Sequence, residues 1–197
     1  MTLATKRIYT PDEYLALERK ATTRSEFING QISAMTGGSR EHNLISGNLF
    51  AELRTQLRHR PCEAYTSNMR VRIKPAGLYT YPDGIVVCGH PHFEDEERDT
   101  LLNPTIVAEV LSSTTEAFDR GAKFAHYRYV DSLQEYVLIA QERMQVDHFA
   151  RVGQQWLLTS YSRPDEILSL PSIECTVPLS EIYARVELSA ETVLAHP

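Results

Sequence analysis

Two acidic residues lie in or beside short apolar segments, and they constrain the fold more than any other feature. Asp83 directly precedes the apolar segment 85–88, and Glu109 lies inside the segment 105–111. Both segments are short and rich in β-branched residues, which predicts buried strands. A carboxylate inside such a strand is costly to bury unless a positive charge compensates it. The fold must therefore give both acids a partner, and a shared divalent cation would serve both.

The length and charge of the chain limit its class. The 197 residues predict a single domain, residues 1–197, with enough length to bury a core. A net charge of −6 and a pI near 5.6 argue against a protein that coats nucleic acid non-specifically, although a local basic groove remains compatible with them. The segment 1–10 lacks the apolar core of a signal peptide, and no apolar run reaches membrane-spanning length. We therefore expect a cytoplasmic protein without a membrane partner.

The cysteines point to the same compartment. Cys62, Cys88 and Cys175 are odd in number and far apart, and they form no CxxC pair. This spacing argues against a disulfide framework and against a structural zinc site. It fits a reducing cytoplasm.

The remaining pattern predicts helices and strands in alternation. A capping box predicts a helix that starts at Thr10 and ends near Lys20, and Asn29-Gly30 predicts a tight hairpin turn. The other expected elements are a helix over 39–59, strands over 62–74, a helix over 116–130, strands over 134–140, 144–150, 155–161 and 173–177, and a short helix after 179. This order predicts a mixed central β-sheet flanked by helices, of the α/β or α+β class.

The two acids suggest a metal site if their strands are neighbours. Asp83 begins its strand and Glu109 lies late in its own, so the carboxylates converge if the strands are antiparallel. Mg²⁺ prefers oxygen ligands and retains waters, so two carboxylates and a substrate phosphate suffice. Alternatively, Asp83 caps a turn and Glu109 pairs with a buried cation. Taken jointly, the two acids favour a metal.

A wider set of residues resembles a known family. Pro82-Asp83 followed by Glu109 is similar to the PD-(D/E)XK nuclease core. The order of several further motifs resembles the Uma-two family of restriction endonuclease-like proteins: 24–32, His42, 109–112 with Thr114, Asp119, Lys123, Tyr127 and Glu135-Tyr136. The match runs from about Tyr9 to Tyr183, which we take as the core. The resemblance implies a restriction-endonuclease-like fold and nucleic-acid cleavage that depends on Mg²⁺ or Mn²⁺.

The resemblance also implies roles for single residues. Asp83 and Glu109 would be metal ligands, and the backbone carbonyl of Val110 could supply another oxygen. Glu26 matches the family's early acid and could bind a second metal or an outer-shell water. It could equally be a surface residue of the hairpin or a partner for Arg24.

The chain departs from the motif at its lysine. That lysine should follow the glutamate by two residues, where this chain has Leu111. Lys123, on the following helix, is the best substitute, although Asp119 and Lys123 could instead form an ordinary i,i+4 surface pair. His42 could contact a phosphate or orient Glu26, or could simply be a polar surface residue.

A nuclease also needs a positive surface for the nucleic-acid backbone. Arg70, Arg72 and Lys74 alternate along one strand, which would align three charges on one side of the sheet. A second basic cluster, Arg54, Arg58 and Arg60, ends the long helix. Either could be an ordinary solvated face, and we favour the strand set because it leads into the Asp83 strand.

These observations support three hypotheses. The first is a metal-dependent endonuclease acting on DNA, in which Asp83 and Glu109 hold the metal, Lys123 assists the attacking water and Glu26 tunes the site. The second is a nuclease-fold module that binds DNA or a protein without cutting, which Leu111 and the acidic charge favour. The third is a structural subunit without nucleic acid. Exposed strand edges or the leucine stripe of the long helix could support a homodimer.

Overall fold

Three sheets and several short helices build the chain in the computed structural model, which describes residues 7–74 and 77–188. The elements in chain order are α1 (Pro11–Glu18), β1 (Ser25–Ile28), β2 (Gln31–Ala34), α2 (Arg40–Leu57), β3 (Cys62–Thr66), β4 (Arg70–Ile73), β5 (Leu78–Thr80), β6 (Gly84–Cys88), β7 (Thr100–Leu101), β8 (Ile106–Leu111), α3 (Glu116–Phe118), the π-helical turn η2 (Asp119–Lys123), α4 (Phe124–Tyr127), β9 (Glu135–Ala140), β10 (Val146–Val152), β11 (Gln155–Tyr161), β12 (Ile167–Leu170), the 3₁₀ turn η3 (Pro171–Ile173), β13 (Cys175–Pro178) and α5 (Leu179–Ile182).

Local chemistry explains where the first elements begin. The Thr10 side chain accepts a hydrogen bond from the Glu13 N–H, and the Glu13 carboxylate accepts one from the Thr10 N–H, so the predicted capping box starts α1. Ser39 caps α2 in the same position by accepting a hydrogen bond from the His42 N–H. Asn29 and Gly30 both have positive φ, as a tight primed turn between β1 and β2 requires.

A six-stranded mixed sheet forms the centre of the fold, with the order β11-β10-β9-β8-β6-β3. Strands β8 and β9 are parallel, and the other neighbours are antiparallel. Strands β6 and β8 pair with Gly84 opposite Ala108. The predicted mixed sheet flanked by helices is therefore confirmed, and so is the antiparallel pairing of the two acid-bearing segments.

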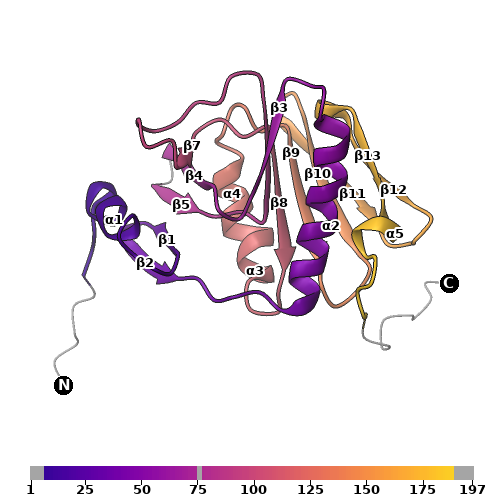
Figure 1. The fold of residues 1–197 in the computed structure, drawn as a ribbon, viewed down its shortest axis with the longest axis horizontal. Coiled ribbons are helices and arrows are strands. Elements are labelled where there is room, and N and C mark those ends of the chain that lie inside the picture. Colours follow the sequence, from indigo (N-terminus) through magenta and orange to yellow (C-terminus); the bar gives the residue numbers. More distant parts are fainter. Residues whose placement is uncertain (1–6, 75–76, 189–197) are drawn as a thin grey trace.

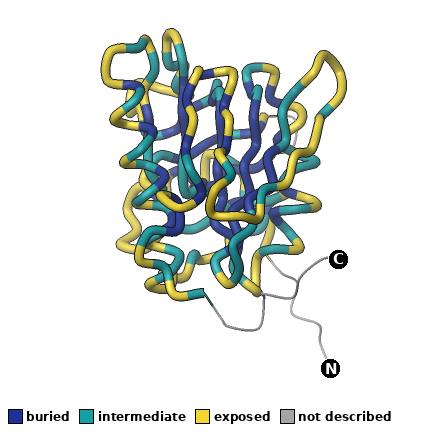
Figure 2. Tube along the Cα trace, turned by 90° about the vertical axis from the view of Figure 1, so that its right-hand side faces the viewer, coloured by how far each residue is buried: buried dark blue, intermediate teal, exposed yellow. Residues whose placement is uncertain are grey.

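The central sheet is covered on both faces (Figure 1). Helix α2 packs on one face through Ile45, Leu49, Leu53 and Leu57, together with β12, β13 and α5. The smaller sheet, with the order β2-β1-β5-β4-β7, and α4 lie on the other side. Buried residues follow the strands, while loops and outward helix faces are exposed (Figure 2).

Alternation along β8 decides where Glu109 points. Ala108 and Val110 belong to the apolar cluster under α2, whereas Val107 and Leu111 belong to the cluster beside α4. Successive side chains of a strand face opposite sides, so Glu109 faces α4 and the smaller sheet. The segment 116–130, which was predicted as one helix, follows β8 and packs on this face. In the structure it is divided into α3, the π turn and α4.

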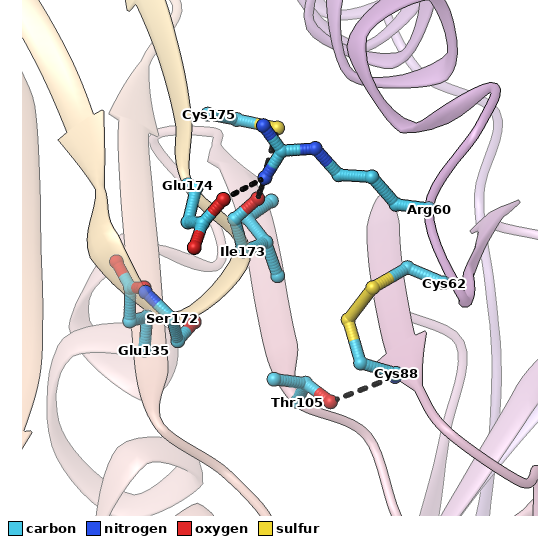
Figure 3. The surroundings of a disulfide bond; sticks show 9 residues. All are labelled: Arg60, Cys62, Cys88, Thr105, Glu135, Ser172, Ile173, Glu174 and Cys175. Atoms are coloured by element: carbon cyan, nitrogen blue, oxygen red, sulfur yellow. Dashed lines mark hydrogen bonds and ion pairs between the residues drawn. A yellow bond between two sulfur atoms is a disulfide. The ribbon is translucent and has the colours of Figure 1, made fainter.

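Two sequence-based expectations need correction. Cys62 and Cys88 form a disulfide between paired positions of β3 and β6, so the argument against disulfides was wrong (Figure 3). Cysteines 26 residues apart carry no sign in the sequence that antiparallel pairing will set them opposite each other. Strand β12 was not expected, although it pairs with β13. No helix in the described part of the chain is long and apolar enough to cross a membrane.

Candidate active site

A buried lysine forms the centre of the cluster that the sequence predicted. Lys123 Nζ lies 2.8 Å from Glu109 Oε1, 3.1 Å from Asp119 Oδ1 and 3.5 Å from Glu26 Oε1. The Lys123, Glu109 and Asp119 side chains are only 5–6% exposed. One ammonium therefore serves three carboxylates.

The π turn explains how Lys123 reaches this position. Asp119 and Lys123 are its first and last residues, and both are buried. The predicted i,i+4 ion pair between them exists, but it lies inside the protein and not on its surface. A π turn widens the helix locally, and such turns are frequent at functional sites.

The smaller sheet supplies Glu26 to the same cluster. Its strand β1 pairs with β5, and Thr80 of β5 donates a hydrogen bond to Glu26 Oε1. Thr80 is fully buried, so it fixes this carboxylate in place. Arg24 bonds elsewhere, to the Ser67 carbonyl and the Asn68 side chain, and is not the partner of Glu26.

Asp83 approaches the cluster from the start of β6. Its Oδ2 accepts the Val110 N–H at 2.8 Å and lies 3.1 Å from His42 Nε2. His42, in the first turn of α2, thus contacts Asp83 and not Glu26. Val110 thus contacts Asp83 through the Val110 N–H. That the Val110 carbonyl binds a metal stays a prediction. Oδ1 of Asp83 has no hydrogen-bond partner among the described residues.

The cluster carries more negative than positive charge. Asp83, Glu109, Asp119 and Glu26 face Lys123 and His42, which leaves a formal charge of −3, or −2 when His42 is protonated. Burial raises the pKa of Glu109 well above its ordinary value, while the Lys123 ammonium opposes this shift. Burial acts to lower the pKa of Lys123, but Glu109, Glu26 and Asp119 outweigh it and raise that pKa well above the ordinary value. The hydrogen bond to Asp83 raises the pKa of His42 against the effect of its burial.

The Tyr127 hydroxyl, at this cluster, is buried without a hydrogen-bond partner among the described residues. Glu109 Oε1, in contrast, is paired with the Lys123 ammonium at 2.8 Å. Orphaned buried polar atoms are rare in folded proteins and point to a water or ion at the site. Tyr127 packs α4 against the sheet beside Tyr136.

Sequence reasoning missed two members of the cluster. Asp119 was considered only as the partner of Lys123, and Thr80 was not considered at all. Asp119 belongs to the motifs that resemble the family, so its place in the cluster could have been inferred once Lys123 was placed beside Glu109. Thr80 carries no comparable motif, and only the pairing of β1 with β5 brings it to Glu26.

The predicted basic strand is not an open surface. Arg70 is 2% exposed and pairs with Asp99 at 2.9 Å, while Arg72 pairs with Glu94. Two of the three aligned charges are therefore paired with acids, and a role of Arg70, Arg72 and Lys74 in nucleic-acid binding stays a prediction. Both acids lie in the loop between β6 and β7, which covers Arg70 and Arg72. A buried guanidinium group is costly without a carboxylate partner, and this loop supplies one to each arginine.

Comparisons with known proteins support the same fold. The Uma2 family, described as "Putative restriction endonuclease", matches residues 11–180. An uncharacterized protein of Synechocystis sp., sll1609, is 42% identical over 160 residues, which cover 81% of this chain and 90% of that protein. A second, slr1290, is 34% identical over 175 residues, 88% of this chain and 90% of its own length. A crystal structure from Anabaena variabilis, titled a putative nuclease belonging to DUF820, is similar with a TM-score of 0.72 at 19% identity and covers 88% of this chain and 97% of its own.

Proposed function

The chain belongs to the Uma2 family of restriction endonuclease-like proteins, and from this premise we propose that it is a metal-dependent endonuclease that hydrolyses phosphodiester bonds in DNA. The observation that carries the proposal is the buried excess of negative charge around Lys123. Buried carboxylates without full compensation are costly, and their burial is common where a cation or a reacting group completes the site.

The residues fit a divalent cation that keeps some of its water. Among the described residues, no three His, Cys, Asp or Glu side chains are arranged to hold a metal alone. Mg²⁺ is commonly bound by one or two carboxylates together with waters and substrate phosphates. The carboxylates of Asp83 and Glu109 would hold it, with Val110 contributing its carbonyl. Asp83 would bind through Oδ1, which has no hydrogen-bond partner in the described chain. When bound, the metal would supply charge stabilisation and a more acidic water.

Residues of the chain itself provide the remaining chemistry. Lys123 Nζ, beside Glu109, is placed to hold the attacking water and to stabilise negative charge that develops on the phosphoryl oxygens. Glu26 and Asp119 hold that ammonium in place from two different elements. His42 and the Val110 N–H hold Asp83, so its free oxygen points in a fixed direction.

Calorimetric titration with Mn²⁺ of the wild type and Asp83→Asn tests the site. Asparagine keeps the shape and can still accept the Val110 N–H, so the fold should persist, which circular dichroism checks. We expect Mn²⁺ binding and cleavage of a supercoiled plasmid in the wild type, and loss of both in the variant. Asp165→Asn, at a side chain that is 75% exposed, removes the same charge far from the cluster and should change neither. Full binding and cleavage by Asp83→Asn would refute the assignment.

A nuclease-fold module that binds DNA without cutting is the second candidate. One observation favours it: the motif lysine is replaced by Leu111, and Lys123 already contacts three carboxylates. An ammonium so engaged could serve only to neutralise the acids. Mn²⁺ binding together with DNA binding, but without turnover on any duplex or single strand, would favour this candidate.

A further inference from the structure

A basic hollow lies at the far end of α2, away from the acidic cluster. Its volume is about 410 Å³, and it lies between the last turns of α2 and strand β3. Its lining includes Arg54, Arg58, Arg60, Cys62, Glu63 and Tyr65. Strand β3 is an outer strand of the six-stranded sheet, so the hollow lies at the edge of the fold. Three arginines against one glutamate give it a positive balance.

Two of these arginines have no carboxylate partner in the described chain. Arg60 donates hydrogen bonds to the Ile173 carbonyl and to Glu174, and thus ties α2 to η3 (Figure 3). Neither Arg54 nor Arg58 makes an ion pair with any described residue, and the Arg54 guanidinium lies 5.8 Å from the centre of the Phe50 ring. Both are exposed. In contrast, Arg70 and Arg72 are neutralised by acids.

The helix end explains only part of this charge. Cations near a helix C-terminus interact favourably with its dipole. However, Arg54 and Arg58 are one turn apart, and like charges at that spacing repel each other by a few tenths of a kcal/mol. The dipole also gives no reason for a hollow beside them. An anion held between the two guanidinium groups accounts for both features.

A row of side chains connects this hollow to the acidic cluster. Residues four apart form a ridge along a helix, and one such ridge of α2 contains His42, Ser46, Phe50, Arg54 and Arg58. It starts at His42, which contacts Asp83, and ends at the hollow. Ser46, Phe50 and Asp83 line a second, small cavity that shares Ala64 with the hollow. The small cavity and the hollow thus border each other at Ala64, between α2 and β3.

The length of this path is set by the helix. A rise of about 1.5 Å per residue puts Arg54 and Arg58 about 18 and 24 Å from His42 along the axis. A DNA duplex rises about 3.4 Å per base pair. A duplex that lies along α2 would therefore bring the arginines to its backbone about five to seven base pairs from a phosphate bound at Asp83.

We propose that the hollow lined by Arg54, Arg58 and Arg60 binds the phosphodiester backbone of DNA about five to seven base pairs from the phosphate that is cleaved. This inference rests on the proposed nuclease function. It places the positive surface that binds DNA at the end of α2 and not on the strand that bears Arg70. Arg54 and Arg58 bind phosphate oxygens through paired N–H groups, the geometry that guanidinium favours. Arg60 remains a structural anchor with one face toward the hollow.

Fluorescence anisotropy with a labelled 20-base-pair duplex tests the proposal, with Ca²⁺ replacing Mg²⁺ to limit cleavage. We expect Arg54→Gln/Arg58→Gln to weaken binding about tenfold at 0.1 M salt and to reduce the slope of log K against log salt by about 1.8, since two phosphate contacts are lost. Lys20→Gln/Arg163→Gln removes the same charge from two exposed positions and should leave the slope unchanged. Arg54→Lys/Arg58→Lys should keep most of the slope, because the charges remain.

The outcomes separate this inference from the function on which it rests. A wild type that binds and cuts DNA, with an Arg54→Gln/Arg58→Gln variant of unchanged affinity and slope, overturns the hollow as a backbone site but leaves the nuclease intact. If the Arg54→Gln/Arg58→Gln variant and the Lys20→Gln/Arg163→Gln control lose equal affinity for DNA, the proposal is also overturned, because the loss then follows from net charge alone. A wild type that neither binds nor cuts DNA overturns both proposals.

Discussion

Replacement of Lys123 by methionine is the sharpest perturbation of the acidic cluster, since it removes the ammonium and keeps most of the volume. Contacts of 2.8, 3.1 and 3.5 Å to three carboxylates are lost together. At an effective dielectric constant of about 20, each unit-charge pair at these distances contributes roughly 5 to 6 kcal/mol of gross attraction. Most of it is offset by the desolvation of the buried charges, and breaking such a pair typically costs a net 3 to 5 kcal/mol because a charge remains buried alone.

Urea unfolding followed by circular dichroism measures this loss. With an m-value of about 2 kcal/mol/M, we expect the midpoint of Lys123→Met to fall by roughly 1.5 to 2.5 M. The Lys123→Met/Glu109→Gln variant should recover roughly 1 to 3 kcal/mol, because it removes the carboxylate closest to the missing ammonium. Mn²⁺ at a hundred times its Kd should stabilise any folded variant that binds it by about 2.7 kcal/mol.

The combination of outcomes is what distinguishes a nuclease centre from a structural ion pair. If the cluster is a nuclease centre, Lys123→Met should unfold more easily and should no longer cleave DNA. Its affinity for Mn²⁺ should stay the same or rise, because the ammonium no longer competes with the metal for the carboxylates. Lys20→Met, at an exposed position, is the matched control and should behave as the wild type. A Lys123→Met protein within 1 kcal/mol of the wild type would refute the account of a buried, charge-compensating lysine.

Two further predictions concern the frame around the site. Reduction of the Cys62–Cys88 disulfide, or its removal by Cys88→Ser, should lower the free energy of unfolding by about 3.5 kcal/mol, from the entropy of a loop of this length. An equal urea midpoint with and without dithiothreitol would contradict this. The hydrogen bond from Arg19 lowers the pKa of Asp99, so the stability that this carboxylate contributes is present above the unfolded-state pKa of about 4 and is lost as the pH falls below it. Asp99→Asn should flatten the acid limb of a plot of urea midpoint against pH, and an unchanged limb would show that Asp99 does not contribute.

The sequence was sufficient for features that depend on local chemistry. Thr10, Ser39 and Asn29-Gly30 each act on neighbouring backbone groups, so the starts of α1 and α2 and the turn between β1 and β2 were predictable. Apolar segments with β-branched residues likewise located β6 and β8. The convergence of Asp83 and Glu109 followed from one further assumption, antiparallel pairing, which the structure confirms.

Features that depend on distant pairing were not predictable in the same way. Alternating arginines indicate a shared strand face, but the sequence does not say whether that face contacts solvent or an acidic loop. In the structure Arg70 and Arg72 form ion pairs with acids of the same chain. The register of β3 against β6 brings Cys62 opposite Cys88, and nothing local encodes that register. The same limit explains why Thr80 was missed, because its role depends on the pairing of β5 with β1.

The lysine beside Glu109 comes from a helical turn and not from the strand that carries the acid. Position 111 is two residues after Glu109, so its side chain shares the face of β8 that carries the carboxylate. Leucine there joins the apolar cluster beside α4 and leaves the acid without a cation from its own strand. The π turn brings Lys123 to the same face, 2.8 Å from Glu109, and Asp119 comes with it. A lysine from a helical turn thus reaches Glu109 although position 111 is leucine, so Leu111 by itself does not leave this carboxylate without an ammonium.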